Sequence, residues 1–135
     1  MATTTAQLVL TSTDLLSDSL SLSAIATLTG AGNSTGLTST GGLARKTTES
    51  ASQYTLFAAA SYTDDKAHKI YLKNMETSAG LYFLISIHDV EVGRIYAGDW
   101  ALIPWSADTT NDNADFKITP STSASHTLEY MIIHE

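Results

Sequence analysis

The stretch from Asp18 to Thr29 reads DSLSLSAIATLT and alternates apolar with polar side chains. From Leu20 onward the even positions are Leu or Ala, and the odd positions are mostly Ser or Thr. A β-strand points successive side chains to opposite faces, so this period of two predicts a strand with one buried face. As a single strand it would be about 40 Å long, far beyond the usual length. We therefore expect a bend here, or a crossing from one sheet to another.

The same alternation recurs along the rest of the chain, and no helical stripe exceeds two turns. Ser and Thr together make up 36 of the 135 residues, a composition that suits strands, solvated sheet faces and turns. Further strands are predicted at about 6–11, 44–49, 54–60, 68–74, 81–88, 90–96, 99–104, 115–119 and 127–134. The pattern predicts an all-β chain, an antiparallel two-sheet β-sandwich that is jelly-roll-like, forming a single domain over residues 1–135. Residues 30–42 are rich in Ser, Thr and Gly, and we expect a flexible loop or arm there.

The charge balance excludes several kinds of partner. Fourteen acidic residues against seven basic ones give a net charge of −7, and the few basic residues form no stripe, so we expect no nucleic-acid binding. No apolar run reaches the roughly 20 residues of a membrane helix, and the N-terminus does not look like a signal peptide. The chain contains no Cys, which excludes disulfides and thiolate chemistry.

We find no pattern that predicts catalysis or a cofactor. The segment from Asp108 to Asp115 is rich in Asp and Asn and is the best metal candidate, but it lacks the Gly and closing Glu of an EF-hand loop. Turns use the same residues, so we interpret it as a hairpin loop. The four His residues are scattered, and no G-x-S-x-G nucleophile motif occurs. We expect no metal, no cofactor and no enzymatic activity.

Two predicted strands, 81–88 and 127–134, are apolar on both faces. A sandwich strand buries only one face against the other sheet, so the second face needs a cover. A neighbouring copy of the chain is the simplest cover, and it predicts a homo-oligomer. The candidate interface residues on these strands are Tyr82, Leu84, Tyr130, Met131 and Ile133.

Three aromatic residues gather in the segment 93–105, which reads GRIYAGDWALIPW. They are Tyr96, Trp100 and Trp105, on two strands that a turn joins. Core packing accounts for one face of such a strand. Exposed aromatic side chains would instead indicate a subunit interface or a stacking platform for sugars. We include all three among the candidate interface residues.

The segments 66–74 (KAHKIYLKN), 93–105, 115–120 (DFKITP) and 128–131 (LEYM) together resemble small β-sandwich virion proteins of tailed bacteriophages. The resemblance covers roughly residues 60–135, and its motifs are structural, with no catalytic residue to carry over. It implies a component of the virus particle, made in the host cytoplasm, with the major capsid protein or other virion proteins as partners.

The function that the resemblance favours is head decoration, in which a cement protein stabilises the capsid by added subunit contacts. On an icosahedral shell this favours a homotrimer at a threefold site. A tail, adaptor or fibre-associated protein is the first alternative, and a carbohydrate-binding β-sandwich is the second.

Overall fold

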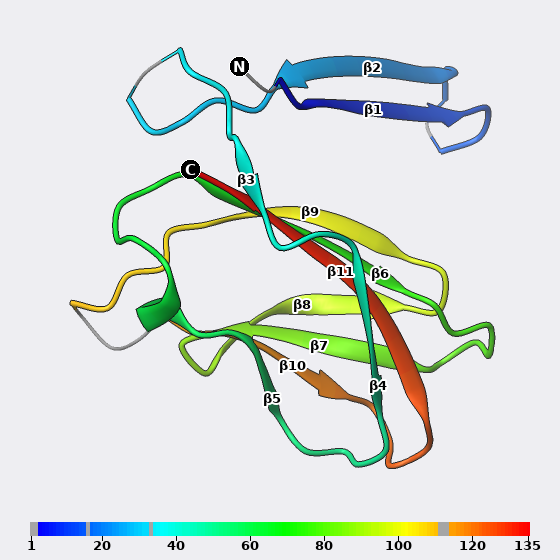
Figure 1. Ribbon diagram of the computed structural model, residues 1–135. Coiled ribbons are helices and arrows are strands. Elements are labelled where there is room, and N and C mark those ends of the chain that lie inside the picture. Colours follow the sequence, from blue (N-terminus) through cyan, green and yellow to red (C-terminus); the bar gives the residue numbers. More distant parts are fainter. Residues whose placement is uncertain (1–2, 16, 33, 111–113) are drawn as a thin grey trace.

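The computed structural model describes residues 3–15, 17–32, 34–110 and 114–135 of the chain. Strands of the described part pair in antiparallel fashion and form two sheets that pack face to face, with a separate two-stranded ribbon above them (Figure 1). The antiparallel two-sheet sandwich predicted from the alternation is confirmed.

Sheet I has the strand order β5-β10-β7-β8. Its strands are β5 (Tyr54–Phe57), β7 (Tyr82–Ile87), β8 (Val90–Tyr96) and β10 (Phe116–Pro120). Sheet II has the order β3-β11-β6-β9, with β4 also paired to β11. Its strands are β3 (Ser39–Thr40), β4 (Ala44–Thr48), β6 (His68–Asn74), β9 (Trp100–Trp105) and β11 (His126–His134). A short 3-10 helix, Ala59–Ser61, follows β5.

The core lies between the inner faces of the two sheets. Strand β6 shows how the alternation builds it, because Ile70 and Leu72 are fully buried while the residues between and beside them are partly exposed. From sheet I, Phe83, Phe116 and Ile118 meet them, each with no exposed surface. Burying a large apolar side chain stabilises the fold by about 1.5–3 kcal/mol, so this layer is the main source of stability.

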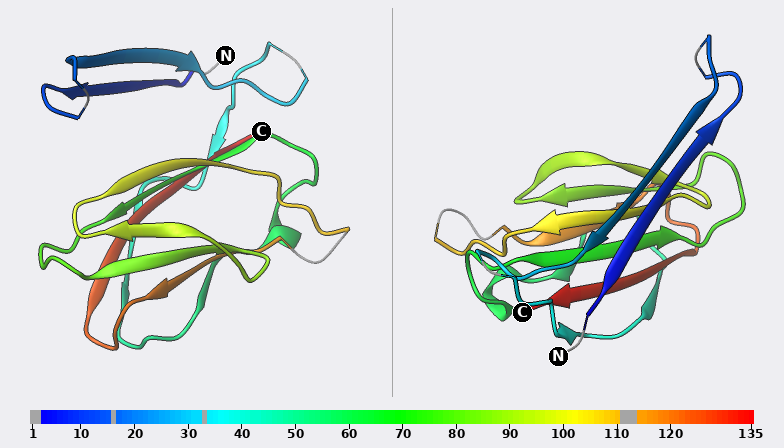
Figure 2. Two further views of the ribbon diagram at one scale, coloured as in Figure 1. Left: turned by 180° about the vertical axis from the view of Figure 1, so that it is seen from behind. Right: turned by 90° about the horizontal axis from the view of Figure 1, so that it is seen from above.

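A ribbon of two strands projects from the sandwich. Strands β1 (Thr5–Ser12) and β2 (Leu20–Thr27) pair over eight consecutive residues without a bulge. We call residues 5–27 the arm. It lies across the outer face of sheet II and extends beyond the body (Figure 2). The stretch that opened the sequence analysis therefore forms β2 over Leu20–Thr27 within this ribbon, and the expected crossing between the two sheets of the sandwich does not occur.

The segment expected to be flexible, residues 30–42, is fastened to the body in its described part. Leu37 is only 1% exposed. Strand β3 pairs with the end of β11, and the Thr40 hydroxyl donates to the Ile132 carbonyl oxygen at 2.7 Å. The projecting element of this protein is the arm, and residues 30–42 form its base.

Candidate interaction surfaces

The aromatic segment 93–105 is divided between three environments. Trp105 is 4% exposed and lies in the core, where its Nε1 donates to the Ala114 carbonyl oxygen at 2.7 Å. Trp100 is 54% exposed on the outer face of sheet II, because it alternates with the inward-facing Ala101. Tyr96 is 44% exposed and follows the buried Ile95 on β8, so it belongs to the outer face of sheet I.

A tight turn separates these side chains. The Tyr96 amide donates to Asp99 Oδ2 at 2.8 Å, and the Asp99 amide donates back to the Tyr96 carbonyl oxygen at 2.9 Å. Between them Gly98 has φ +83°, in the left-handed region that glycine adopts without strain. Because the turn carries the chain from sheet I to sheet II, Tyr96 and Trp100 end on opposite faces of the sandwich. The three aromatic residues therefore do not form one stacking platform.

The candidate interface residues on β7 lie on the outer face of sheet I. Tyr82 and Leu84 are half-buried, and they alternate with the fully buried Phe83. The ring of Tyr82 lies 5.3 Å from that of Tyr96, and the Arg94 guanidinium lies 4.8 Å over it. These contacts within the chain cover part of the face that the sequence left uncovered.

The candidate residues on β11 are covered by the chain itself. Tyr130 faces the core, with its ring 5.8 Å from that of Phe57. Ile133 faces outward but is only 8% exposed, because it packs in a cluster with Leu28, just after the arm, and with Leu37 in the base of the arm. Met131 packs against the same cluster. Two isolated leucines of the polar N-terminal half therefore cover Ile133, so its burial needs no second copy, and the homo-oligomer stays a prediction.

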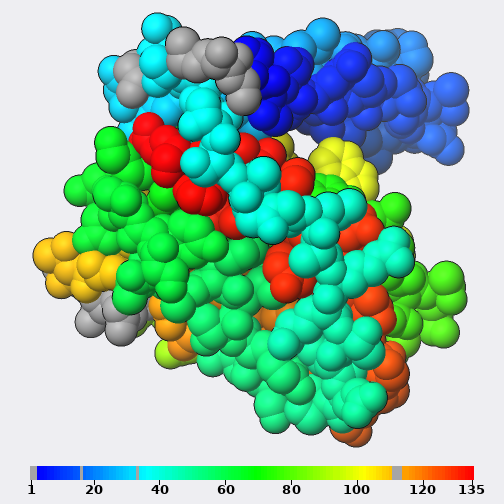
Figure 3. Space-filling view, in the orientation of Figure 1, coloured from blue at the N-terminus to red at the C-terminus, as the bar shows by residue number. Residues whose placement is uncertain are grey.

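The arm is an exposed apolar surface that sequence reasoning missed. One face carries Leu8, Leu10 and Leu22, and the opposite face carries Val9 and Ile25, all of them exposed. In the space-filling view the far end of the arm extends past the body (Figure 3). The signal was present in the sequence, because both strands alternate and neither contains a charged residue.

A cleft separates the arm from the outer face of sheet II. It has a volume of about 270 Å³ and is lined by Ala6, Gln7, Leu8, Ala24, Ala26, Trp100 and Leu102. Its lining is nearly all apolar, and it holds no titratable side chain. This cleft offers packing surface, without groups that could activate a substrate or hold an ion.

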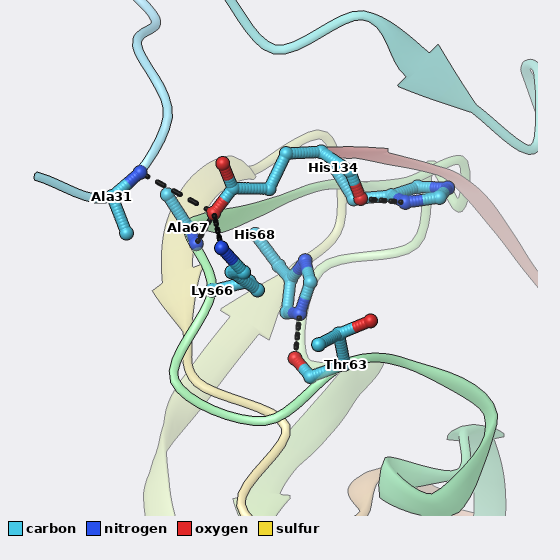
Figure 4. Close-up of polar contacts among 7 residues, drawn as sticks. Ala31, Thr63, Lys66, Ala67, His68 and His134 are labelled. Atoms are coloured by element: carbon cyan, nitrogen blue, oxygen red, sulfur yellow. Dashed lines mark hydrogen bonds and ion pairs between the residues drawn. The ribbon is translucent and has the colours of Figure 1, made fainter. Parts of the chain in front are cut away.

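Titratable side chains gather near the base of the arm, where β11 ends beside the start of β6 (Figure 4). The ring of His68 lies 6.0 Å from that of His134, and its Nε2 is 3.0 Å from the Thr63 carbonyl oxygen. Burial lowers the pKa of His68 below its usual value. The ring of His68 lies between those of Tyr62 and Trp105, and its Nδ1 is buried without a partner among the described residues, so His68 is packed as a core residue.

The carboxylate of Glu135 closes this end. Its Oε1 accepts from the amides of Ala67 at 3.2 Å and Ala31 at 3.3 Å, and the Lys66 ammonium lies 3.8 Å away. Desolvation raises the pKa of Glu135, but these three partners outweigh it, and the pKa is lowered overall. These contacts thus attach Glu135 to Ala31 in the base of the arm and to Lys66 and Ala67 just before β6.

The loop that was the best metal candidate is described except at residues 111–113. Asp108 accepts from the Thr110 amide at 2.7 Å, and Asp115 accepts from the Ala59 amide at 2.8 Å. Each carboxylate therefore accepts a hydrogen bond from a backbone amide, as Asp commonly does in turns and at helix starts. Within the described ranges, no three His, Asp or Glu side chains come close enough together to hold a metal ion. The described part likewise contains no helix long and apolar enough to cross a membrane.

Comparison with known proteins adds little to this geometry. The chain matches no family model, and a search of curated proteins gave no match. Among solved structures it is similar to the Yersinia pseudotuberculosis-derived mitogen, with 9% sequence identity and a TM-score of 0.44 over 70% of this chain and 85% of that one. A similarity at this level says nothing about function. The class that the fold defines is an all-β sandwich with an apolar arm.

Proposed function

We propose that the chain is a structural component of a bacteriophage particle, and that it acts as a capsid decoration protein by adding subunit contacts. The observation that carries this proposal is the exposed apolar arm on an otherwise ordinary sandwich. A lone two-stranded ribbon is marginally stable in water, and further strands or packing against a neighbour stabilise it. Such an arm is useful in a protein that is completed by neighbours in an assembly.

Three further properties support an assembly role. The cleft and the exposed aromatic residues provide packing surface on both outer faces of the sandwich. Large exposed apolar patches mark interaction sites in soluble proteins. The acidic charge of −7 keeps the protein from binding packaged or free DNA. The assignment to a phage head, with the major capsid protein as partner and the virion as location, comes from the sequence resemblance.

The proposal is tested on particles assembled with and without the chain. We expect purified particles to contain it in stoichiometric amounts by mass spectrometry, with immunogold label on the head. Particles that lack it should rupture at a lower temperature, and adding the purified protein should restore the rupture temperature, because a ligand that binds only the intact state stabilises it.

A matched pair of variants locates the contact. Leu22→Asp places a charge on the apolar face of the arm, whereas Thr55→Asp places the same charge at an exposed site on sheet I. We expect Leu22→Asp to lose the restoring effect and Thr55→Asp to keep it. Absence of the chain from purified particles would refute the proposal, and label confined to the tail would favour the tail or fibre alternative.

A further inference from the structure

The arm has two open strand edges. In the described part of the chain, β1 and β2 pair with each other and with no other strand. Each edge therefore presents a row of backbone N–H and C=O groups that another strand can bind. Eight residues at the usual rise make an edge about 27 Å long.

The phase of the hydrogen bonds shows which residues face outward. The Leu28 amide donates to the Thr4 carbonyl oxygen at 2.9 Å, continuing the β1–β2 register. Hydrogen-bonded and non-hydrogen-bonded pairs alternate along an antiparallel ladder. The even residues of β1 thus bond to β2, and the odd ones, which include Val9, point their N–H and C=O groups out of the open edge.

Proteins usually protect such edges with Lys, Pro, a bulge or a short strand. The arm uses none of these, since β1 reads TAQLVLTS, β2 reads LSLSAIAT, and their pairing has no irregularity. The segment Gln7–Ser12 combines strand-forming residues with no charge and no Pro, which is typical of segments that pair with copies of themselves.

Charge indicates where two copies can meet. Of the 21 charged side chains, only Asp14 and Asp18 precede Arg45, and both lie in the connection between β1 and β2. Two copies that each carry a charge of −7 repel one another. They approach at least cost through the uncharged strands of the arm.

We infer that the arm binds the arm of a second copy by pairing β1 with β1 about a two-fold axis at Val9. Two identical strands related by such an axis are antiparallel, so Leu8 of one copy lies opposite Leu10 of the other. This brings four leucines together on one face of a four-stranded sheet. Centring the axis on β2 at Ser23 would instead place Leu22 opposite Ala24, which buries less apolar surface.

The size of this contact sets its strength. The contact is about 27 Å long, the length of the strand edge, and about 10 Å thick, the thickness of one sheet. It therefore buries a few hundred Å² of surface per copy, less than the roughly 800 Å² of a standard interface. Pairing still completes a sheet of more than two strands, which an isolated ribbon needs for stability. We therefore expect reversible association, with Kd in the micromolar range.

This contact goes beyond the proposed function, because it needs no particle and occurs in the purified protein. It also differs from the expected homotrimer, since a two-fold contact by itself gives a dimer. A trimer would require a second, cyclic interface elsewhere on the chain.

Cysteine cross-linking tests the contact directly, because the chain has no cysteine of its own. In Val9→Cys the two introduced residues would face each other with Cα atoms about 5.5 Å apart, a separation that a disulfide spans. Ser23→Cys is the matched control, since Ser23 pairs with Val9 across the ribbon and is likewise exposed but lies on the other edge. Mild oxidation at about 10 µM should convert most of Val9→Cys to a covalent dimer and little of Ser23→Cys.

Sedimentation of proteins that contain no cysteine provides a second, independent test. At about 100 µM the native chain should approach twice its monomer mass of 14.4 kDa by sedimentation. Val9→Pro should stay monomeric with an unchanged circular dichroism spectrum, since it removes an outward N–H and no β1–β2 hydrogen bond. Val9→Thr keeps that N–H and should still associate.

Two results would overturn the inference. One is a folded native chain that remains monomeric at this concentration, which would leave the edge for a strand of a different protein. The other is preferential cross-linking of Ser23→Cys, which would move the contact to β2. Failure of particle binding alone, with cross-linking intact, would refute the proposed function and leave this contact standing.

Discussion

Asn74, at the end of β6, shows how one side chain joins the two sheets. It has no exposed surface, and its Nδ2 donates to the carbonyl oxygens of Leu81 at 3.2 Å and Ile95 at 3.1 Å. Its Oδ1 accepts from the Glu76 amide at 3.0 Å. A buried backbone group without a hydrogen-bond partner costs free energy. The side-chain amide of Asn74 supplies a partner to three such groups where the two sheets meet.

We expect Asn74→Ala to lower the free energy of unfolding by about 2–4 kcal/mol, because it leaves buried donors and acceptors unpaired. Asn74→Asp should cost at least as much, since a carboxylate oxygen would then face two carbonyl oxygens. Urea titration followed by circular dichroism measures both, with the exposed Thr55→Ala as control. Variants as stable as the native chain would show that water replaces the amide.

His68 makes stability depend on pH. Burial lowers its pKa in the folded protein, so the unfolded chain binds the proton more tightly. Stability therefore falls as the pH drops below about 6.5, the ordinary pKa of histidine, and continues to fall until the folded state also takes up the proton. Thermal melts between pH 7.5 and pH 5 should show a decline that is smaller in His68→Phe, which keeps the ring packing against Tyr62 and Trp105. An equal decline in both proteins would assign the effect to other groups.

At the scale of elements, alternation predicted the strands well and their placement poorly. The bounds of β6 and β8 were predicted as observed, and most other strands within one or two residues. The pattern in β2 is as regular, yet this strand belongs to no sandwich sheet. Periodicity reports that a strand has an apolar face and carries no information about what covers that face.

The candidate surface was predictable only in part for the same reason. Leu28 and Leu37 stand alone in a polar stretch, so nothing in their neighbourhood indicated that they cover Ile133. Trp100 and Trp105 lie on opposite faces of β9, but the predicted strand, 99–104, ended before Trp105. The sequence could not say which of those faces was the core.

We expect the sandwich to fold without the arm. A chain that begins at Leu28 keeps the cluster of Leu28, Leu37 and Ile133 and loses the contact of Ala6 with it and the hydrogen bond from the Leu28 amide to Thr4. Its free energy of unfolding should fall by less than about 2 kcal/mol, whereas Leu37→Ala in the full chain should cost about 2–5 kcal/mol. Thermal melts followed by circular dichroism compare the two. A shortened chain that does not melt cooperatively would mean that the arm is part of the core.

Over the whole molecule, nearly all charged side chains lie on the body, and the two strands of the arm carry none. The arm contributes two of the fourteen acidic residues and none of the seven basic ones, so residues 28–135 carry a net charge of −5. Self-association through the arm brings these like-charged bodies together, and their repulsion opposes it.

Salt should therefore strengthen the association of the native chain. Raising NaCl from about 0.02 M to about 0.5 M shortens the screening length from roughly 20 Å to about 4 Å, which removes most of the repulsion between the bodies. Sedimentation should then show a several-fold lower Kd. A contact made by ion pairs would respond in the opposite direction, and weakening by salt would contradict an uncharged interface.

The separation of Trp100 from Trp105 gives the protein two optical reporters. Trp105 lies in the core beside His68, with ring centroids 5.7 Å apart, and Trp100 lies in the cleft under the arm. In Trp100→Phe the remaining emission reports on unfolding and on the protonation of His68. In Trp105→Phe it reports on the arm, so a shift to shorter wavelength on adding particles or on raising the protein concentration would mark closure of the cleft. One chain can thus signal its folding and its assembly through two different side chains.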